Sequence, residues 1–157
     1  MLALLLAWLV PGAGHMYLGR YVRGLILLLT ISGLFWSGVA MGGVLTVDYE
    51  AERWWFIADM FAGVHGLVSY YRQKNVYEAL RRDPEVVQSA GPTEAVIDKR
   101  LNDKGLALVH PVDNIARAYA GIAGLLNLLC MFDAAVLALM GRFGEDKFEE
   151  PFPKSRP

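Results

Sequence analysis

The sequence predicts an all-α integral membrane protein, a helical bundle of about four transmembrane helices whose N-terminal part is a kinked helical hairpin. Hydrophobic residues make up 55% of the 157 residues, and charged residues only 20%. The charges avoid four segments, residues 2–19, 24–47, 54–71 and 118–140, which contain only Asp59 and Asp133. Such long apolar segments are typical of membrane spans. A net charge of −1 and a single cysteine argue against a nucleic-acid-binding module and a disulfide-stapled secreted domain.

Three of these segments are long enough to cross a bilayer as single helices. Residues 24–47 would form a helix of about 36 Å, against a hydrocarbon core of about 30 Å. In the segment 54–71, paired tryptophans stand at one end, and paired tyrosines followed by basic residues stand at the other, as interfacial anchors do. The segment 118–140 is long enough despite Asn127 and Asp133. We therefore expect a span in each.

The N-terminal segment is less regular, because Pro11 interrupts it after ten residues. A helix that continues through this proline to Leu18 would reach about 26 Å, a thin span with a kink. A re-entrant or half-inserted helix is the alternative. The segment lacks the basic start and the small-residue cleavage site of a signal peptide, so we expect it to be retained.

The spans divide the chain into five parts. The third connection is polar and interrupted by prolines and glycines, so we expect only short helices there, at 75–82 and 93–103. The parts are a two-helix hairpin at 1–47, a third span at 48–71, a loop with short helices at 72–117, a fourth span at 118–141 and a polar extended tail at 142–157.

Basic residues predict the orientation of these spans. Arg20 and Arg23 lie in the first connection, Arg53 lies in the second among acidic residues, and the loop 72–117 is rich in basic residues. The positive-inside rule then places the first connection and the loop in the cytoplasm, and both termini outside. A solvated loop is the simplest interpretation of 72–117, with a docking module as the alternative, and its bases can touch anionic lipid headgroups.

The densest motif is a glycine-rich stretch after the first apolar helix, LAWLVPGAGHMYLGRYVRGLILLL. It resembles the tight hairpin of the TM-two domain, in which a G-x-G-H turn and an aromatic Tyr-Leu-Gly-Arg segment join two helices. Together with AGIAGLLNLLCMFDA at 120–134, it is similar to a group of uncharacterised bacterial membrane proteins, which implies the bacterial inner membrane. Met16 departs from the aromatic residue usual in that family. The motif residues are Pro11, Gly12, Gly14, His15, Tyr17, Gly19 and Arg20.

Four polar residues lie inside the predicted third and fourth spans: Asp59, His65, Asn127 and Asp133. In each span the two polar residues are six apart, so one antiparallel register opposes Asp59 with Asp133 and His65 with Asn127. We expect the two carboxyl groups to lie close together at one depth. Packing within the bundle is the simpler interpretation, and a functional role for intramembrane ionisable groups is the alternative.

Small residues recur at a spacing of four, which allows helix backbones to approach closely. The sequence leaves open whether the contact is within the bundle or with another protein. The residues are Gly38 and Gly42, then Ala58, Ala62 and Gly66, and then Ala120 and Gly124.

No pattern of residues predicts a metal site, a cofactor or a nucleophilic centre. The three histidines are not spaced as ligands, and Cys130 lies in the middle of a predicted span. We therefore expect a non-catalytic accessory or scaffolding subunit, with membrane lipids and other integral membrane subunits as partners and no nucleic acid. The alternative is a transport or proton-relay component that uses Asp59, His65 and Asp133, and a membrane-embedded enzyme comes third.

Overall fold

The computed structural model describes residues 2–47, 53–82, 84, 94–105 and 112–141, and these form helices and turns without a strand. The all-α prediction is therefore confirmed for this part of the chain. The predicted extended tail 142–157 lies outside the described residues, as do 48–52 at the start of the predicted third-span part. The helices are α1 (Leu2–Leu9), α2 (Ala13–Tyr17), α3 (Tyr21–Gly42), α4 (Arg53–Met60), α5 (Val64–Arg81), α7 (Glu94–Asp103) and α8 (Val112–Leu139), with a 3-10 turn, η1, at Gly43–Thr46.

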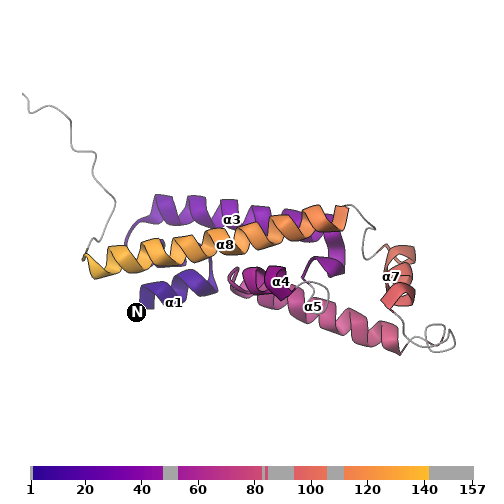
Figure 1. Ribbon diagram of the computed structural model, residues 1–157. Coiled ribbons are helices and arrows are strands. Elements are labelled where there is room, and N and C mark those ends of the chain that lie inside the picture. Colours follow the sequence, from indigo (N-terminus) through magenta and orange to yellow (C-terminus); the bar gives the residue numbers. More distant parts are fainter. Residues whose placement is uncertain (1, 48–52, 83, 85–93, 106–111, 142–157) are drawn as a thin grey trace, which may run out of the picture.

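Helices α3 and α8 are the two longest of the described helices, and they pack side by side in antiparallel directions (Figure 1). Near one end, a Cβ atom on Gly38 would lie 2.6 Å from the Ala116 carbonyl oxygen, so the two backbones touch there. Ile31, Phe35 and Val39 of α3 pack with Ala120 and Ala123 of α8 in the main apolar core. These two helices are the only described ones long and apolar enough to cross a membrane. The structure thus supports two candidate spans where the sequence predicted about four.

The predicted N-terminal span is not a continuous helix. Helix α1 has eight residues and a length of about 12 Å, too short to cross a hydrocarbon core of about 30 Å. The chain turns at Gly12, whose φ is +81°, and α2 folds back on α1. A Cβ atom on Gly14 would lie 2.5 Å from the Ala3 carbonyl oxygen, so α2 packs directly on the α1 backbone. Residues 2–17 therefore form a short reversed hairpin, the geometry of the re-entrant alternative.

The predicted span 54–71 is also divided. Helix α4 ends at Met60, the chain turns at Gly63 with a φ of +65°, and α5 runs back in the opposite direction (Figure 1). Helix α5 continues to Arg81, so the short helix expected at 75–82 is the end of a longer one. Hydropathy could not indicate this division, because the break is made by one glycine in an apolar stretch.

The division at Gly63 changes which parts of the chain share an end of the bundle. Tyr21 begins α3 at one end, whereas α7 and the start of α8 lie at the other end (Figure 1). The first connection and the loop 72–117 were predicted on the same side. In the structure the first connection lies at one end of the α3 and α8 pair, and α7, a described part of that loop, lies at the other end. The predicted orientation counted a crossing at 54–71, and neither α4 nor α5 is among the described helices that are long and apolar enough to cross a membrane. The side of the membrane on which each end lies stays a prediction.

Candidate functional site

The two reversed hairpins meet at the middle of α8, where Asn127 joins their tips. The Asn127 Nδ2 group donates to the carbonyl oxygens of Phe61 at 2.8 Å, Ala7 at 3.1 Å and Trp8 at 3.4 Å. The Trp8 indole donates from Nε1 to the Met60 carbonyl oxygen at 3.3 Å, which joins α1 to α4 directly. The carboxyl ends of two short helices therefore converge on one buried side chain.

Close approach of another backbone segment explains why each of the two turns needs glycine. A Cβ atom on Gly63 would collide with the Trp8 carbonyl oxygen, and one on Gly12 would collide with the Gly24 carbonyl oxygen. Both glycines also have a positive φ, which L side chains rarely adopt. The two turns are thus fixed by backbone approach as well as by backbone conformation.

The chemistry of the junction is that of a helix cap made by a distant side chain. The last carbonyl groups of a helix lack donors within the helix, and away from water they need them from elsewhere. The Asn127 amide supplies two N–H donors to three such carbonyl groups, and Asn127 is fully buried. Asn127 therefore stabilises the meeting of α1 and α4, which agrees with the packing interpretation of this residue.

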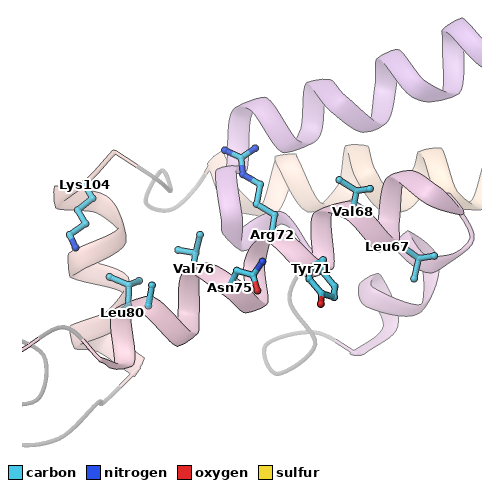
Figure 2. Close-up of a pocket in the computed structure, with 9 residues that line it drawn as sticks. Leu67, Val68, Tyr71, Arg72, Asn75, Val76, Leu80 and Lys104 are labelled. Atoms are coloured by element: carbon cyan, nitrogen blue, oxygen red, sulfur yellow. The ribbon is translucent and has the colours of Figure 1, made fainter.

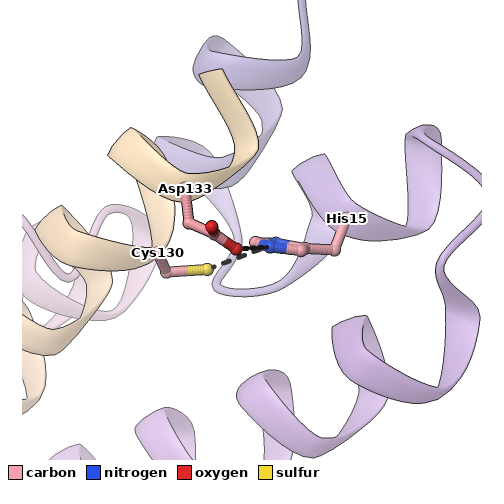
Figure 3. A network of polar contacts seen from close by, with 3 residues as sticks. All are labelled: His15, Cys130 and Asp133. Atoms are coloured by element: carbon pink, nitrogen blue, oxygen red, sulfur yellow. Dashed lines mark hydrogen bonds and ion pairs between the residues drawn. The ribbon is translucent and has the colours of Figure 1, made fainter. Parts of the chain in front are cut away.

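A second polar network lies between α2 and α8 and consists of His15, Cys130 and Asp133 (Figure 3). Its α8 residues lie one to two turns beyond Asn127 in the sequence. His15 Nε2 lies 2.8 Å from Asp133 Oδ2, and His15 Nδ1 lies 3.6 Å from the Cys130 sulfur. The tautomer that donates from Nε2 to the Asp133 carboxyl oxygen accepts a hydrogen bond from the Cys130 thiol at Nδ1. The His15 side chain is 1% exposed and that of Asp133 58%, so the network reaches from the interior to the outer face of α8.

The order of thiol, imidazole and carboxylate resembles that of an activated nucleophile. The Cys130 residue, however, is only 5% exposed and packs in the main core cluster with α3 residues. A substrate would reach its sulfur only if the helices separated. The geometry therefore favours a structural hydrogen-bond network that holds α2 against α8.

The structure contradicts the predicted register of Asp59 against Asp133 and His65 against Asn127. Asp133 bonds His15 instead, and the two Asp59 oxygens have no hydrogen-bond partner among the described residues. The side chain of His65 bonds the carbonyl oxygen of Ala62 in its own turn. It also lies edge-on to the rings of two α3 residues, Phe35 and Trp36.

The predicted register fails because α4 runs in the opposite direction to the one it assumed. Three successive contacts show its direction: the Trp55 ring lies against Gly121, the Ala58 backbone against Gly124, and the Phe61 carbonyl group binds Asn127. The residue numbers therefore rise in the same direction along both helices. Helix α4 is thus parallel to α8, whereas the predicted register assumed an antiparallel span. Asp59 is then about one residue beyond the level of Gly124, and Asp133 lies roughly 12 Å further along α8.

The glycine-rich motif is distributed over the first hairpin and its link to α3. Pro11 and Gly12 form the turn, Gly14 packs on α1, His15 joins the network, and Gly19 has a φ of +81°. Of the two remaining motif residues, Arg20 is buried and Tyr17 is exposed.

The small residues face neighbouring helices of the same chain. Gly42 lies against Ala116 and Thr46, and Gly66 lies against the Asp59 backbone. The remaining members pack inside the bundle in the same way: Gly38 on α8, Ala58 against Gly124, and Ala62 and Ala120 fully buried in the main core. These positions therefore present no free surface to another protein.

Comparison with known proteins gives a family without an assigned activity. The model of a family of unknown function (DUF6677) matches residues 2–147. A stretch of 29 residues is 62% identical to an uncharacterized protein of Methanocaldococcus jannaschii, covering 18% of this chain and 29% of that protein. The chain thus matches less than a third of that relative's length, and no solved structure matches. These matches bear on neither the TM-two resemblance nor a bacterial source.

Proposed function

The chain belongs to the DUF6677 family of unknown function, and we propose that it is an integral membrane protein that acts without catalysis, as an accessory or scaffolding subunit of a larger membrane complex. Its partners in this proposal are membrane lipids and other integral membrane subunits. The likeness of residues 6–29 to the TM-two hairpin supports the bacterial inner membrane as its location.

The exposed apolar faces of α3 and α8 support the membrane location. In the most apolar 18 residues of these helices, only 28% and 33% of the residues are buried. The core helix of a water-soluble protein of this length would be mostly covered, because large exposed apolar faces are costly in water. On α8 the exposed face includes Leu125, Leu126, Leu129, Phe132 and Val136.

We propose that only α3 and α8 cross the bilayer, while the α1/α2 and α4/α5 hairpins enter it from opposite sides and meet at Asn127. Irregular backbone at membrane depth is tolerated where protein buries it, and the junction meets this requirement. The basic loop 72–117 then lies in the cytoplasm, with both termini outside. In contrast to the orientation expected from four spans, Arg20 and Arg23 lie outside in this arrangement.

Asp133 is the observation that supports a partner. Its side chain remains 58% exposed after it has bonded His15, and exposed apolar residues surround it on α8, with Leu129 and Phe132 on one side and Val136 on the other. A carboxylate facing lipid is expensive, and intramembrane ionisable groups normally face protein or a water-filled cavity. A neighbouring helix that offers a hydrogen-bond donor to Asp133 would remove this cost. The proposed docking surface is therefore the outer face of α8.

The proposal is tested by co-purification in mild detergent. We expect Leu129→Trp, which adds bulk to this face, and Asp133→Asn, which keeps an oxygen for His15 but removes the charge, each to reduce recovery of the complex about tenfold. Leu29→Trp is the matched control, because Leu29 is equally exposed on α3. Wild-type protein that elutes alone as a monomer, or equal losses in all three variants, would overturn the proposal.

Asp59 supports a second candidate function, a transport or proton-relay component. Asp59 is fully buried, and both of its carboxyl oxygens are without a hydrogen-bond partner in the described part of the chain. Such a group is a candidate for reversible protonation inside a membrane. Loss of proton flux in proteoliposomes for Asp59→Asn, with the complex still recovered, would favour this function over the first.

A further inference from the structure

We propose that the junction of the two hairpins binds a small monovalent cation, Na⁺, between the buried Asp59 carboxyl group and the side-chain oxygen of Asn127. The proposal deepens the second candidate function, transport or proton relay, and rests on the membrane-embedded junction that this function requires. Binding of Na⁺ to the purified chain does not depend on flux, so the site and the function can fail separately.

Three buried side-chain oxygens have no hydrogen-bond donor among the described residues and lie close to this junction in the fold. They are the two carboxyl oxygens of Asp59 and Oδ1 of Asn127, and both residues are 0% exposed. Away from water, an oxygen acceptor without a donor is costly, and a carboxylate without a compensating charge is more so. A bound cation would compensate all three oxygens, whereas a single proton on Asp59 would not.

Asp59 is held beside one turn of α8 by the residues on either side of it. The carbonyl oxygen of the preceding residue, Ala58, lies close to Gly124. The carbonyl oxygen of Phe61, two residues after Asp59, accepts a hydrogen bond from Asn127. Gly124 and Asn127 are three residues apart and therefore neighbours on the surface of α8. Asp59 and Asn127 thus belong to the same level of the bundle.

The ends of α1 and α4 make this level electronegative. The two helices end there, at Leu9 and Met60, and the C-terminal end of a helix carries a partial negative charge. Asn127 donates to carbonyl groups at both ends but brings no formal charge, so the partial charges are not cancelled. In secondary transporters, the C-terminal ends of interrupted membrane helices coordinate Na⁺.

The oxygen ligands favour a small hard cation of single charge. Carboxylate, amide and hydroxyl oxygens are hard ligands, and one carboxylate balances one positive charge. The hydroxyl group of Ser69 is a further candidate ligand, because it is buried without a hydrogen-bond partner in the described chain. Ser69 lies one turn after Gly66, which packs against the Asp59 backbone.

The charge of Arg117 acts on Asp59 from the other direction along α8. Arg117 interacts electrostatically with Asp59 and precedes Asn127 by ten residues, or about 15 Å of helix. Asp59 is level with the residues just before Asn127, so it lies between the levels of the two α8 residues. A cation on the Asn127 side of the carboxyl group is therefore on the side away from Arg117.

The open groove along α5 is a different feature and does not suit a cation (Figure 2). It has a volume of about 790 Å³, and its lining includes Arg72 and Lys104 but no acidic residue. A cation in this groove would find no opposite charge in the lining. The buried carboxyl group of Asp59 therefore assigns the site to the junction.

The proposal is tested on the full chain in mild detergent, by thermal unfolding in NaCl and in choline chloride, each at about 150 mM. We expect Na⁺ to raise the midpoint of unfolding of the wild type by about 4 °C, as for a ligand at about ten times its Kd. Asp59→Asn keeps the shape of the side chain and removes its charge, so it should abolish this shift. Asp103→Asn is the matched control, because it removes an exposed carboxylate on α7, and it should keep the full shift.

Saturation binding of radioactive sodium to the wild type measures the site directly and does not depend on how well a variant folds. We expect Ser69→Ala to lower the affinity for Na⁺ about fivefold, because it removes one neutral oxygen ligand. No saturable binding, equal effects of Na⁺ and choline on the wild type, or an undiminished shift in Asp59→Asn would overturn the proposal. Proton flux that depends on Asp59 in a chain that binds no Na⁺ would support the transport function and contradict only this site.

Discussion

The two halves of the bundle are built alike but treat their buried polar groups differently. In each half a short helix runs along α8 and ends at Asn127, and the chain then reverses at a glycine with a positive φ. In the α1/α2 half, His15 bonds both Asp133 and Cys130. In the α4/α5 half, the carboxyl group of Asp59 is buried without a hydrogen bond in the described part of the chain. The hydrogen-bonded groups stabilise the fold, whereas the carboxyl group without a hydrogen bond costs stability and is a candidate for function.

The largest expected effect comes from the turn of the α4/α5 half. Gly63→Ala should lower the free energy of unfolding by about 3 kcal/mol, because the added Cβ meets the Trp8 carbonyl oxygen in a backbone conformation strained for alanine. Thermal unfolding in detergent measures it. Gly105→Ala is the matched control, since Gly105 has a φ of +64° with nothing within 4 Å, and it should lose only about 1 kcal/mol. Equal losses would mean that close approach at the junction is unimportant.

Asn127 is shared by the two halves, so its removal should affect both. Asn127→Leu leaves three helix-end carbonyl groups without a donor, and we expect a loss of about 2 kcal/mol. Ser37→Ala, which removes only a bond to Leu34 within the same helix, should change stability by less than about 0.5 kcal/mol. An Asn127→Leu variant as stable as the wild type would show that the tips meet through packing alone.

Replacing the carboxyl group of Asp133 and replacing that of Asp59 should change the free energy of unfolding in opposite directions. Asp133→Leu leaves the buried His15 Nε2 without its acceptor and should cost about 1–2 kcal/mol. Asp59→Leu removes a buried group that has no hydrogen bond to lose, so stability should stay the same or rise. The comparison uses unfolding of both variants in the same detergent. A marked loss for Asp59→Leu would show that the electrostatic interaction of this carboxyl group with Arg117 outweighs the cost of its burial, and would remove the difference between the halves.

The sequence predicted the long helices well and the reversals poorly. The apolar segments 24–47 and 118–140 correspond to α3 and α8, and the helix expected at 93–103 corresponds to α7, because length and hydropathy determine such elements. The segment 54–71 has the same apolar composition, and its reversal depends on one glycine that touches a carbonyl group 55 residues earlier in the chain. No local pattern reports such a contact.

The contacts of the candidate site could not be predicted from the sequence for the same reason. Asn127 and Asp133 stood out as polar residues in an apolar segment, but their partners lie far away in the sequence. His15, Ala7 and Trp8 are more than 100 residues away in the first hairpin, and Phe61 is 66 residues away after α4. The predicted partner of Asp133 came from an assumed antiparallel span, and the direction of α4 made it wrong. His15 was a motif residue whose link to Asp133 and Cys130 needed the fold.

In the proposed topology the chain crosses the bilayer only twice, and two hairpins turn back inside it. Single cysteines at Tyr21, Arg53 and Asn102, all exposed, test this in a Cys130→Ser background with an impermeant thiol reagent on intact cells. With two crossings, we expect the cysteines at 53 and 102 to be protected alike and the cysteine at 21 to be labelled, because positions 53 and 102 then lie on the same side of the membrane. Labelling of Arg53 with protection of both Tyr21 and Asn102 is the pattern of four spans and would contradict it.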